Sequence, residues 1–268
     1  MTWGVNQRDT QTEFFYQADY FQKDYTEIVV IVAVSAAIKG EISLGLSSAT
    51  GSDVWESREK RPLLQSSDIQ KIGVSAEDQL RANVYGLLAR VLAEPPSSET
   101  LEILRGLIDA DDGSELGKAM AQLGDSAVKT VRGRAEEEYT LLFYGAGAGG
   151  EIHPYGSFYR TGFIYEQPLS DLRDDMGELG IAPSGFNSEP EDHIAFLCEL
   201  MHGLITGTYG APADIEAQKR FFNRHLAPWA VPFFDDLATA ETSALYVPVG
   251  LIGSLFVSVE STAFAMAV

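Results

Sequence analysis

The helical period of the apolar residues after Ser75 constrains the fold of this chain most strongly. In successive segments Leu, Ile, Val, Phe and Met recur every three or four residues, which is the spacing of one face of an α-helix. No Asn-Gly or Asp-Gly turn joins two alternating apolar segments there, as a β-hairpin would require. We therefore predict an all-α fold, with one globular helical domain over residues 75–268.

Start and stop signals divide this domain into separate helices. Ser75 and Asp78 are spaced as a helix cap, which predicts a first helix from this point. Pro95 and Pro96 end it. An apolar seam predicts a longer helix over residues 128–143. Further helices are expected near residues 98–108, 116–123, 169–179, 213–223, 229–237 and 245–256.

The central stretch, residues 188–205, joins an apolar helix to a strongly polar start. Ser188 and Glu191 are spaced as a capping box, and Pro190 stands where a missing N–H costs nothing. Acidic residues and His193 crowd the expected first turn, where the helix dipole favours anions and a neighbouring carboxylate can bring the pKa of a histidine near neutrality. This start is either good capping or a binding site.

Residues 1–74 differ in composition from the helical domain. Aromatic and acidic side chains cluster early, a β-branched run covers residues 28–34, and Gly and Ser are frequent over residues 40–52. Residues 47–52 and 57–62 are typical of a linker. We expect an N-terminal extension that is poorly ordered or loosely docked.

No signal sequence or membrane span is expected. The first 27 residues carry more acid than base, unlike a secretory signal, and the apolar run 28–38 is too short to cross a bilayer. A second apolar run, residues 244–259, is interrupted by Pro248 and closed by Glu260. This favours a buried C-terminal helix over a membrane span.

The chain is strongly acidic. Its 39 Asp and Glu against 19 Lys and Arg give a formal net charge of −20. Such a charge repels nucleic acid and favours basic or arginine-bearing partners. A generally acidic proteome explains it equally well, so we infer only that nucleic acid is not a partner.

The glycine-rich residues 145–150 match a nucleotide-binding motif by letter alone. Gly145, Gly147 and Gly150 fit Gly-x-Gly-x-x-Gly, but that motif must follow a strand and open a helix, whereas here a helix precedes it and a loop follows. We interpret these glycines as the exit from a helix. A nucleotide-binding enzyme that uses this loop stays the alternative.

Neither metal binding nor catalysis has the residues it needs. The four histidines include no His-Glu-x-x-His pair and one cysteine cannot build a zinc site, so we expect no metal and no cofactor. No Gly-x-Ser-x-Gly elbow is present, and Cys198 lies among apolar residues, where a buried thiol is unreactive. A hydrolase would have to use Asp192 and His193 with a nucleophile that the sequence does not reveal. We therefore expect no catalytic residue.

One surface pattern suits the binding of a peptide. A loop rich in proline and aromatic residues contains Pro154 and Tyr155, and the apolar pair Leu142 and Phe143 precedes it. With the acidic start at Asp192, this loop offers apolar contact beside carboxylates, which fits a segment with arginines followed by hydrophobic residues. Equally, these aromatic side chains can simply pack in the core.

Three stretches resemble the TorD/DmsD family of chaperones for molybdenum-containing redox enzymes. They are residues 138–143 (Glu-Tyr-Thr-Leu-Leu-Phe), 153–159 (His-Pro-Tyr-Gly-Ser-Phe-Tyr) and 189–193 (Glu-Pro-Glu-Asp-His). Residues 225–229 (His-Leu-Ala-Pro-Trp) are similar as well, and the likeness covers residues 75–268. The chain departs from the family at Tyr155, where relatives often carry tryptophan, and in its N-terminal extension, for which we recognise no counterpart.

The resemblance implies an all-α cytoplasmic chaperone, monomeric or homodimeric and without catalysis. Such a protein binds the twin-arginine signal peptide of a molybdenum-cofactor oxidoreductase, holds it back from export, and helps the apoprotein receive its molybdopterin cofactor. Acidic side chains would attract the arginine pair, apolar ones would lie along the hydrophobic part of the signal, and His193 would orient Asp192. The implied signal-peptide site consists of Leu142, Phe143, Pro154, Tyr155, Ser157, Glu189, Asp192 and His193.

Overall fold

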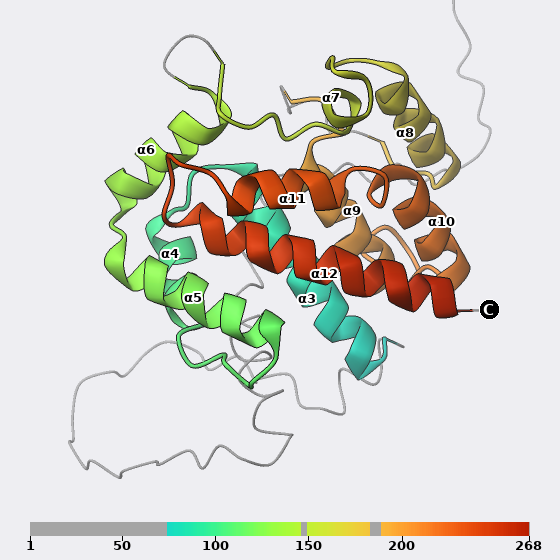
Figure 1. The fold of residues 1–268 in the computed structure, drawn as a ribbon. Coiled ribbons are helices and arrows are strands. Elements are labelled where there is room, and N and C mark those ends of the chain that lie inside the picture. The colour runs from blue at the N-terminus through green and yellow to red at the C-terminus, as the bar shows by residue number, and fades with distance from the viewer. Residues whose placement is uncertain (1–73, 146–148, 183–188, 268) are drawn as a thin grey trace, which may run out of the picture.

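The computed structural model describes residues 74–145, 149–182 and 189–267 (Figure 1). Within these ranges the regular structure consists of ten α-helices without a β-strand, which confirms the predicted all-α class. The expectation of a loosely docked extension falls outside the described residues, apart from Val74. The helices are α3 (Ala76–Ala93), α4 (Ser98–Arg105), α5 (Glu115–Lys129), α6 (Arg132–Phe143), α7 (Gly156–Thr161), α8 (Gln167–Glu178), α9 (Ile194–Thr206), α10 (Ile215–His225), α11 (Ala230–Ala238) and α12 (Tyr246–Met266).

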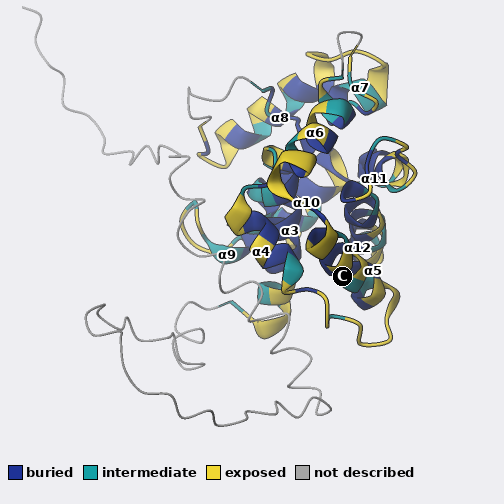
Figure 2. Cartoon of the chain, turned by 90° about the vertical axis from the view of Figure 1, so that its left-hand side faces the viewer, coloured by how far each residue is buried: buried dark blue, intermediate teal, exposed yellow. Residues whose placement is uncertain are grey.

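The core forms around two helices that pack along each other, α3 and α9. The predicted apolar stripe of α9, with Ile194, Leu197, Met201 and Leu204, is buried. Cys198 is buried on the same helix, as expected, and burial raises the pKa of its thiol well above the usual range. Figure 2 shows buried positions concentrated on the helix faces that point inward. Helix α9 therefore carries its first residues, and the turn before them, on a rigid central element.

Helix α12 packs closely on α11 and also contacts α5 (Figure 1). Two glycines make this close approach possible. A Cβ atom at Gly250 would lie 2.3 Å from the Ala238 nitrogen, and one at Gly253 would lie 2.1 Å from the Phe234 ring. Any larger residue at either position would push the two helices apart.

The first predicted helix begins and ends where the sequence signals place it. The Ser75 hydroxyl accepts a hydrogen bond from the Asp78 N–H (3.0 Å), which caps α3, and α3 ends just before Pro95 and Pro96. The capping interaction satisfies an N–H group that has no partner inside the helix.

The predicted helix over residues 128–143 is confirmed as α6 from Arg132 onward, but its first four residues are wrong, because the chain breaks between α5 and α6. Arg105 of α4 donates to the carbonyl oxygens of Ala127 (3.1 Å) and Thr130 (3.2 Å), and so binds the last carbonyl groups of α5. Thr130 has extended backbone angles, and Val131 is 69% exposed. The apolar seam is therefore not continuous, since a side chain distant in sequence ends the helix.

The predicted C-terminal helix is confirmed as α12, and it continues past Glu260, which is paired inside the protein. Arg81 of α3 donates to both of its carboxylate oxygens (2.7 and 2.8 Å), and the Tyr85 hydroxyl donates to it as well (3.0 Å). Helix α12 is long and apolar enough to cross a membrane by length and composition, and 44% of that apolar window is buried in this structure. The absence of a membrane span stays a prediction.

Candidate functional site

Two loops that lie far apart in the sequence meet at the N-terminal end of α9. Tyr155 and His193 face each other in an isolated antiparallel bridge. Beside it, the Gly156 N–H donates to the Asp192 carbonyl oxygen, and the Ile194 N–H donates to that of Pro154, both at 2.9 Å. Backbone hydrogen bonds therefore hold the loop before α7 against the turn before α9.

Helix α9 starts later than predicted. Its N-cap is His193, whose Nδ1 accepts a hydrogen bond from the Ala195 N–H (3.1 Å). The predicted cap, Ser188, lies outside the described residues, and the chain between it and His193 is not helical where it is described. Two sets of bonds account for this: the His193 N–H closes a local turn by donating to the Pro190 carbonyl (3.1 Å), and the backbone on both sides of His193 bonds to the facing loop.

His193 is neutral in this environment, so the expectation of a pKa near neutrality is wrong. Burial lowers the pKa of its imidazole to about 4. Nor does the ring orient Asp192, because its Nδ1 accepts from Ala195 and its edge contacts the ring of Tyr155 at a centroid distance of 5.4 Å. His193 is therefore part of the support for the turn.

Asp192 is the chemically exceptional residue of this junction. It is 2% exposed, and its Oδ2 accepts from the Ser157 N–H (2.6 Å) and from the Ser157 hydroxyl. No group among the described residues donates to its Oδ1, although that atom is buried as well. A buried carboxylate oxygen without a partner is costly for a folded protein, and such groups call for an explanation.

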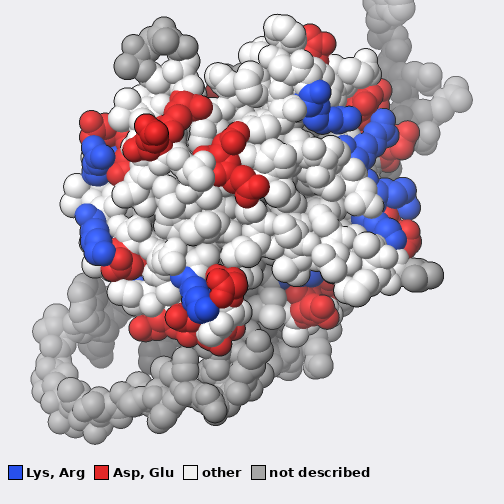
Figure 3. Space-filling model, viewed as in Figure 1, with Lys and Arg blue, Asp and Glu red and all other residues white. Residues whose placement is uncertain are grey.

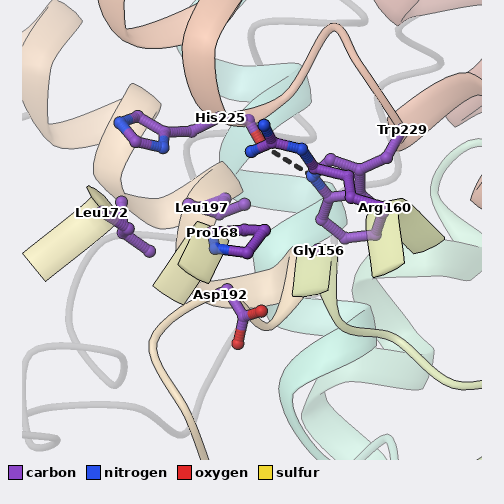
Figure 4. A pocket seen from close by; sticks show the side chains of 8 residues that line it. All are labelled: Gly156, Arg160, Pro168, Leu172, Asp192, Leu197, His225 and Trp229. Carbon is purple, nitrogen blue, oxygen red and sulfur yellow. Dashed lines mark hydrogen bonds between the residues drawn. The ribbon is translucent and has the colours of Figure 1, made fainter. Parts of the chain in front are cut away.

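A small pocket adjoins Asp192 (Figure 4). Its volume is about 10 Å³, which is room for about one water molecule. In the close-up, Asp192 lies at one end of the lining, while Arg160 and His225 lie at the other. A larger group would enter only if the rim opened. The lining residues are Gly156, Arg160, Pro168, Leu172, Asp192, Leu197, His225 and Trp229.

A second carboxylate of the same turn, Glu189, is held by tyrosines. The Tyr155 hydroxyl donates to it, and the Tyr144 hydroxyl approaches at 3.5 Å. Burial, reinforced by the hydrogen bond to Glu189, raises the pKa of Tyr155 well above its usual range, so this phenol stays a donor. Glu189 is half-buried and therefore accessible to a ligand from the protein surface.

The eight predicted site residues differ in their access to solvent. Phe143, Tyr155 and Glu189 are half-buried. Leu142 and Pro154 are buried, so they support the surface from below and do not form it. The three others belong to the buried hydrogen-bonded junction; they are Ser157, Asp192 and His193.

The sequence analysis missed the far side of the pocket. Arg160 lies on α7, a short helix without apolar period, and His225 closes α10. The His225 Nε2 is 2.6 Å from the Asp175 carboxylate of α8, and Arg224 bonds to the same carboxylate (2.7 Å). Burial lowers the pKa of His225, while the bond to Asp175 opposes the shift. Residues 225–229 resemble the family and include His225, so the sequence did carry a signal for this residue. It does not indicate that His225 pairs with Asp175 on α8.

The glycine loop follows α6, and its central residues, 146–148, lie outside the described part of the chain. A Cβ atom at Gly150 would lie 2.4 Å from the Leu142 carbonyl oxygen, so glycine allows the chain to turn back against the end of α6. Among the described residues, no group of three or more His, Cys, Asp or Glu is placed to hold a metal ion.

The chain is similar to known proteins over most of the helical domain. A family described as "Nitrate reductase delta subunit" matches residues 109–235. Chaperone protein TorD of Aliivibrio fischeri is 25% identical over 187 residues, which cover 61% of this chain and 84% of that protein. The probable Tat proofreading chaperone DmsD of Haemophilus influenzae is 29% identical over 126 residues, 46% of this chain and 59% of that protein. Chaperone protein TorD of Vibrio cholerae is 22% identical over 202 residues, 67% of this chain and 90% of that protein.

Proposed function

The chain belongs to the TorD/DmsD family of chaperones, and from this premise we propose that it binds the twin-arginine signal peptide of a molybdoenzyme catalytic subunit. In this proposal it acts in the cytoplasm, before export, and keeps the apoprotein competent to receive its molybdenum cofactor. The helical domain, residues 75–268, carries this function. The family consists of chaperones and not of enzymes, so we do not propose nucleotide or ester hydrolysis at residues 145–150 or at Asp192 and His193.

The observation that carries the proposal is the unpartnered Oδ1 of Asp192 at the pocket. A guanidinium group supplies N–H donors and a positive charge to such an oxygen, and a charge-assisted hydrogen bond gains strength where water is excluded. Arginine suits this role better than lysine, because its planar fork loses less hydration on entering a tight site. The pocket must widen to admit it, so binding is coupled to movement of the rim.

The other predicted residues support the turn that presents this oxygen. Ser157 fixes the opposite oxygen of the same carboxylate, and His193 caps α9 directly behind it. Glu189, held by Tyr155, offers a second carboxylate three residues before Asp192. We assign Glu189 to the second arginine of the pair.

The proposal is tested by calorimetric titration of the full chain with a synthetic twin-arginine leader. Asp192→Asn keeps an oxygen for Ser157 but presents N–H donors where the arginine must donate, so we expect affinity to fall at least about tenfold. Asp109→Asn removes the same charge from an exposed residue and should leave affinity unchanged. Binding of an arginine-free leader as tightly as the natural one would refute the proposal.

A further inference from the structure

The loop between α7 and α8 exposes three consecutive large apolar side chains. Phe163 is 70% exposed, Ile164 is 43% exposed and Tyr165 is 63% exposed. Scattered exposed apolar residues are ordinary on a protein surface, but an uninterrupted run of this kind is not, unless it serves a function. We call residues 163–165 the apolar tip.

The backbone of this loop is built to hold the apolar tip outward. Gly162 ends α7 in the left-handed region (φ 86°), and the Thr161 hydroxyl accepts from the Phe163 N–H (3.2 Å). Tyr165 also adopts a left-handed conformation (φ 64°). It is the only non-glycine residue in the described part of the chain that does so. A bulky residue in that region carries strain that the fold must balance elsewhere.

The apolar tip lies close in sequence to two residues that line the pocket at Asp192. Arg160, three residues before it, and Pro168, three residues after it, both line that pocket. The tip is therefore tethered to the pocket lining by a short stretch of chain on either side. In Figure 3, uncharged surface reaches the end of the molecule that holds α7 and α8, with acidic and basic side chains beside it.

The ligand of the apolar tip can be inferred from what the site at Asp192 lacks. A twin-arginine leader carries its hydrophobic segment after the arginine pair, but Leu142 and Pro154, two of the residues assigned to that segment, are buried. An arginine seated at Asp192 would leave the next residues of the leader at the pocket mouth. The strongly negative chain, at −20, matches the basic start of such a leader and repels acidic competitors.

We propose that the apolar tip, Phe163 to Tyr165, binds the hydrophobic segment of the leader whose arginine pair is held at Asp192. This inference rests on the proposed function and adds a second contact surface to it. The tip selects for apolar length in the leader, while the carboxylates select for the arginine pair. Burial of the three side chains against the leader then contributes much of the affinity.

The test compares two leaders on the full chain. One is natural, and the other keeps the arginine pair but has serine in place of its hydrophobic segment. Phe163→Ser combined with Ile164→Ser should weaken binding of the natural leader at least about tenfold and leave the serine-substituted leader unaffected. Val128→Ser with Val131→Ser is the matched control, because both valines are exposed at a distant site, and it should change neither affinity.

The outcomes distinguish a failure of this inference from a failure of the proposed function on which it rests. If the natural leader binds wild type and the tip variant equally well, the tip is not its contact surface, although the proposed function stands. If wild type binds neither leader, both proposals fail together. If light scattering shows a wild-type dimer that the tip variant lacks, with leader affinity unchanged, the occupant is a second copy of the chain and the inference is overturned.

Discussion

Ser157 donates its backbone N–H and its hydroxyl to the same carboxylate oxygen of Asp192, and the other oxygen of that carboxylate stays without a partner. The two residues come from different elements, helix α7 and the turn before α9, which backbone hydrogen bonds also hold together. The serine therefore fixes the carboxylate in one orientation. A preorganised acceptor of this kind loses little entropy when a donor arrives.

Removal of the Ser157 hydroxyl should loosen this arrangement. Ser157→Ala keeps the backbone bond to Asp192 but deletes a buried, charge-assisted one, so we expect a loss of about 1–3 kcal/mol in the free energy of unfolding and weaker leader binding. Urea titration measures the first quantity. Ser170→Ala, at an exposed position of α8, is the control and should change neither. Unchanged stability in Ser157→Ala would show that the hydroxyl contributes nothing.

Arg160 places a positive charge in the lining of the pocket that we assign to an incoming arginine. Arg160→Gln should remove this repulsion and tighten leader binding by about twofold to fivefold, with a smaller gain at high salt. Arg220→Gln removes an exposed charge outside the lining and should have a weaker effect. Weaker binding in Arg160→Gln would mean that Arg160 contacts the leader favourably.

The buried neutral state of His193 predicts a particular pH dependence. The pKa of His193 is lowered to about 4 in the fold, whereas an unfolded histidine titrates near 6.5, so the unfolded chain binds more protons between these values. Stability is thus fully present above pH 6.5 and is lost as the pH falls towards 4. His193→Asn retains a capping oxygen without titration and should flatten this loss, as chemical unfolding at several pH values would reveal. An unaltered slope would contradict the burial of a neutral imidazole.

Glu199 on α9 should make stability depend on pH in the opposite sense to His193. Burial raises the pKa of its carboxyl group to about 8, so its contribution to stability is fully present below pH 4.5 and is lost as the pH rises through 8. Glu199→Gln should therefore be more stable than wild type at pH 9 and similar to it at pH 5. Thermal unfolding at both pH values checks this. Equal melting temperatures at pH 9 would argue for a charged, solvated carboxylate.

The sequence predicts the helices well where local signals determine them. Ser75 caps α3 because cap and first turn are neighbours in the chain, and the stripe of α9 is buried because its period is local. The break before α6 and the late start of α9 depend on distant partners. Arg105 binds the end of α5, and backbone groups of the facing loop bond on both sides of His193. Neither interaction can be predicted from the sequence of the helix whose end or start it determines.

The candidate site is less predictable than the helices. The family resemblance predicts that Asp192 and Ser157 belong to the site. It does not predict that Ser157 bonds to one oxygen of the Asp192 carboxylate while the other oxygen stays without a partner. Burial of Leu142 and Pro154 depends on packing against several helices, so composition could not separate them from the half-buried Tyr155. Arg160 and His225, on the far side of the pocket, were not predicted for the same reason, because they lie on separate helices.

The account rests on contact between Asp192 and an arginine of the leader, and a double-mutant cycle tests that contact directly. Calorimetry would measure wild type and Asp192→Asn, each with a leader carrying Arg-Arg and with one carrying Gln-Gln at the same positions. We predict a coupling energy of at least about 1.5 kcal/mol, as found for close charge pairs at protein interfaces. If the two changes add to within about 0.5 kcal/mol, Asp192 does not contact the arginine pair, and the account is wrong.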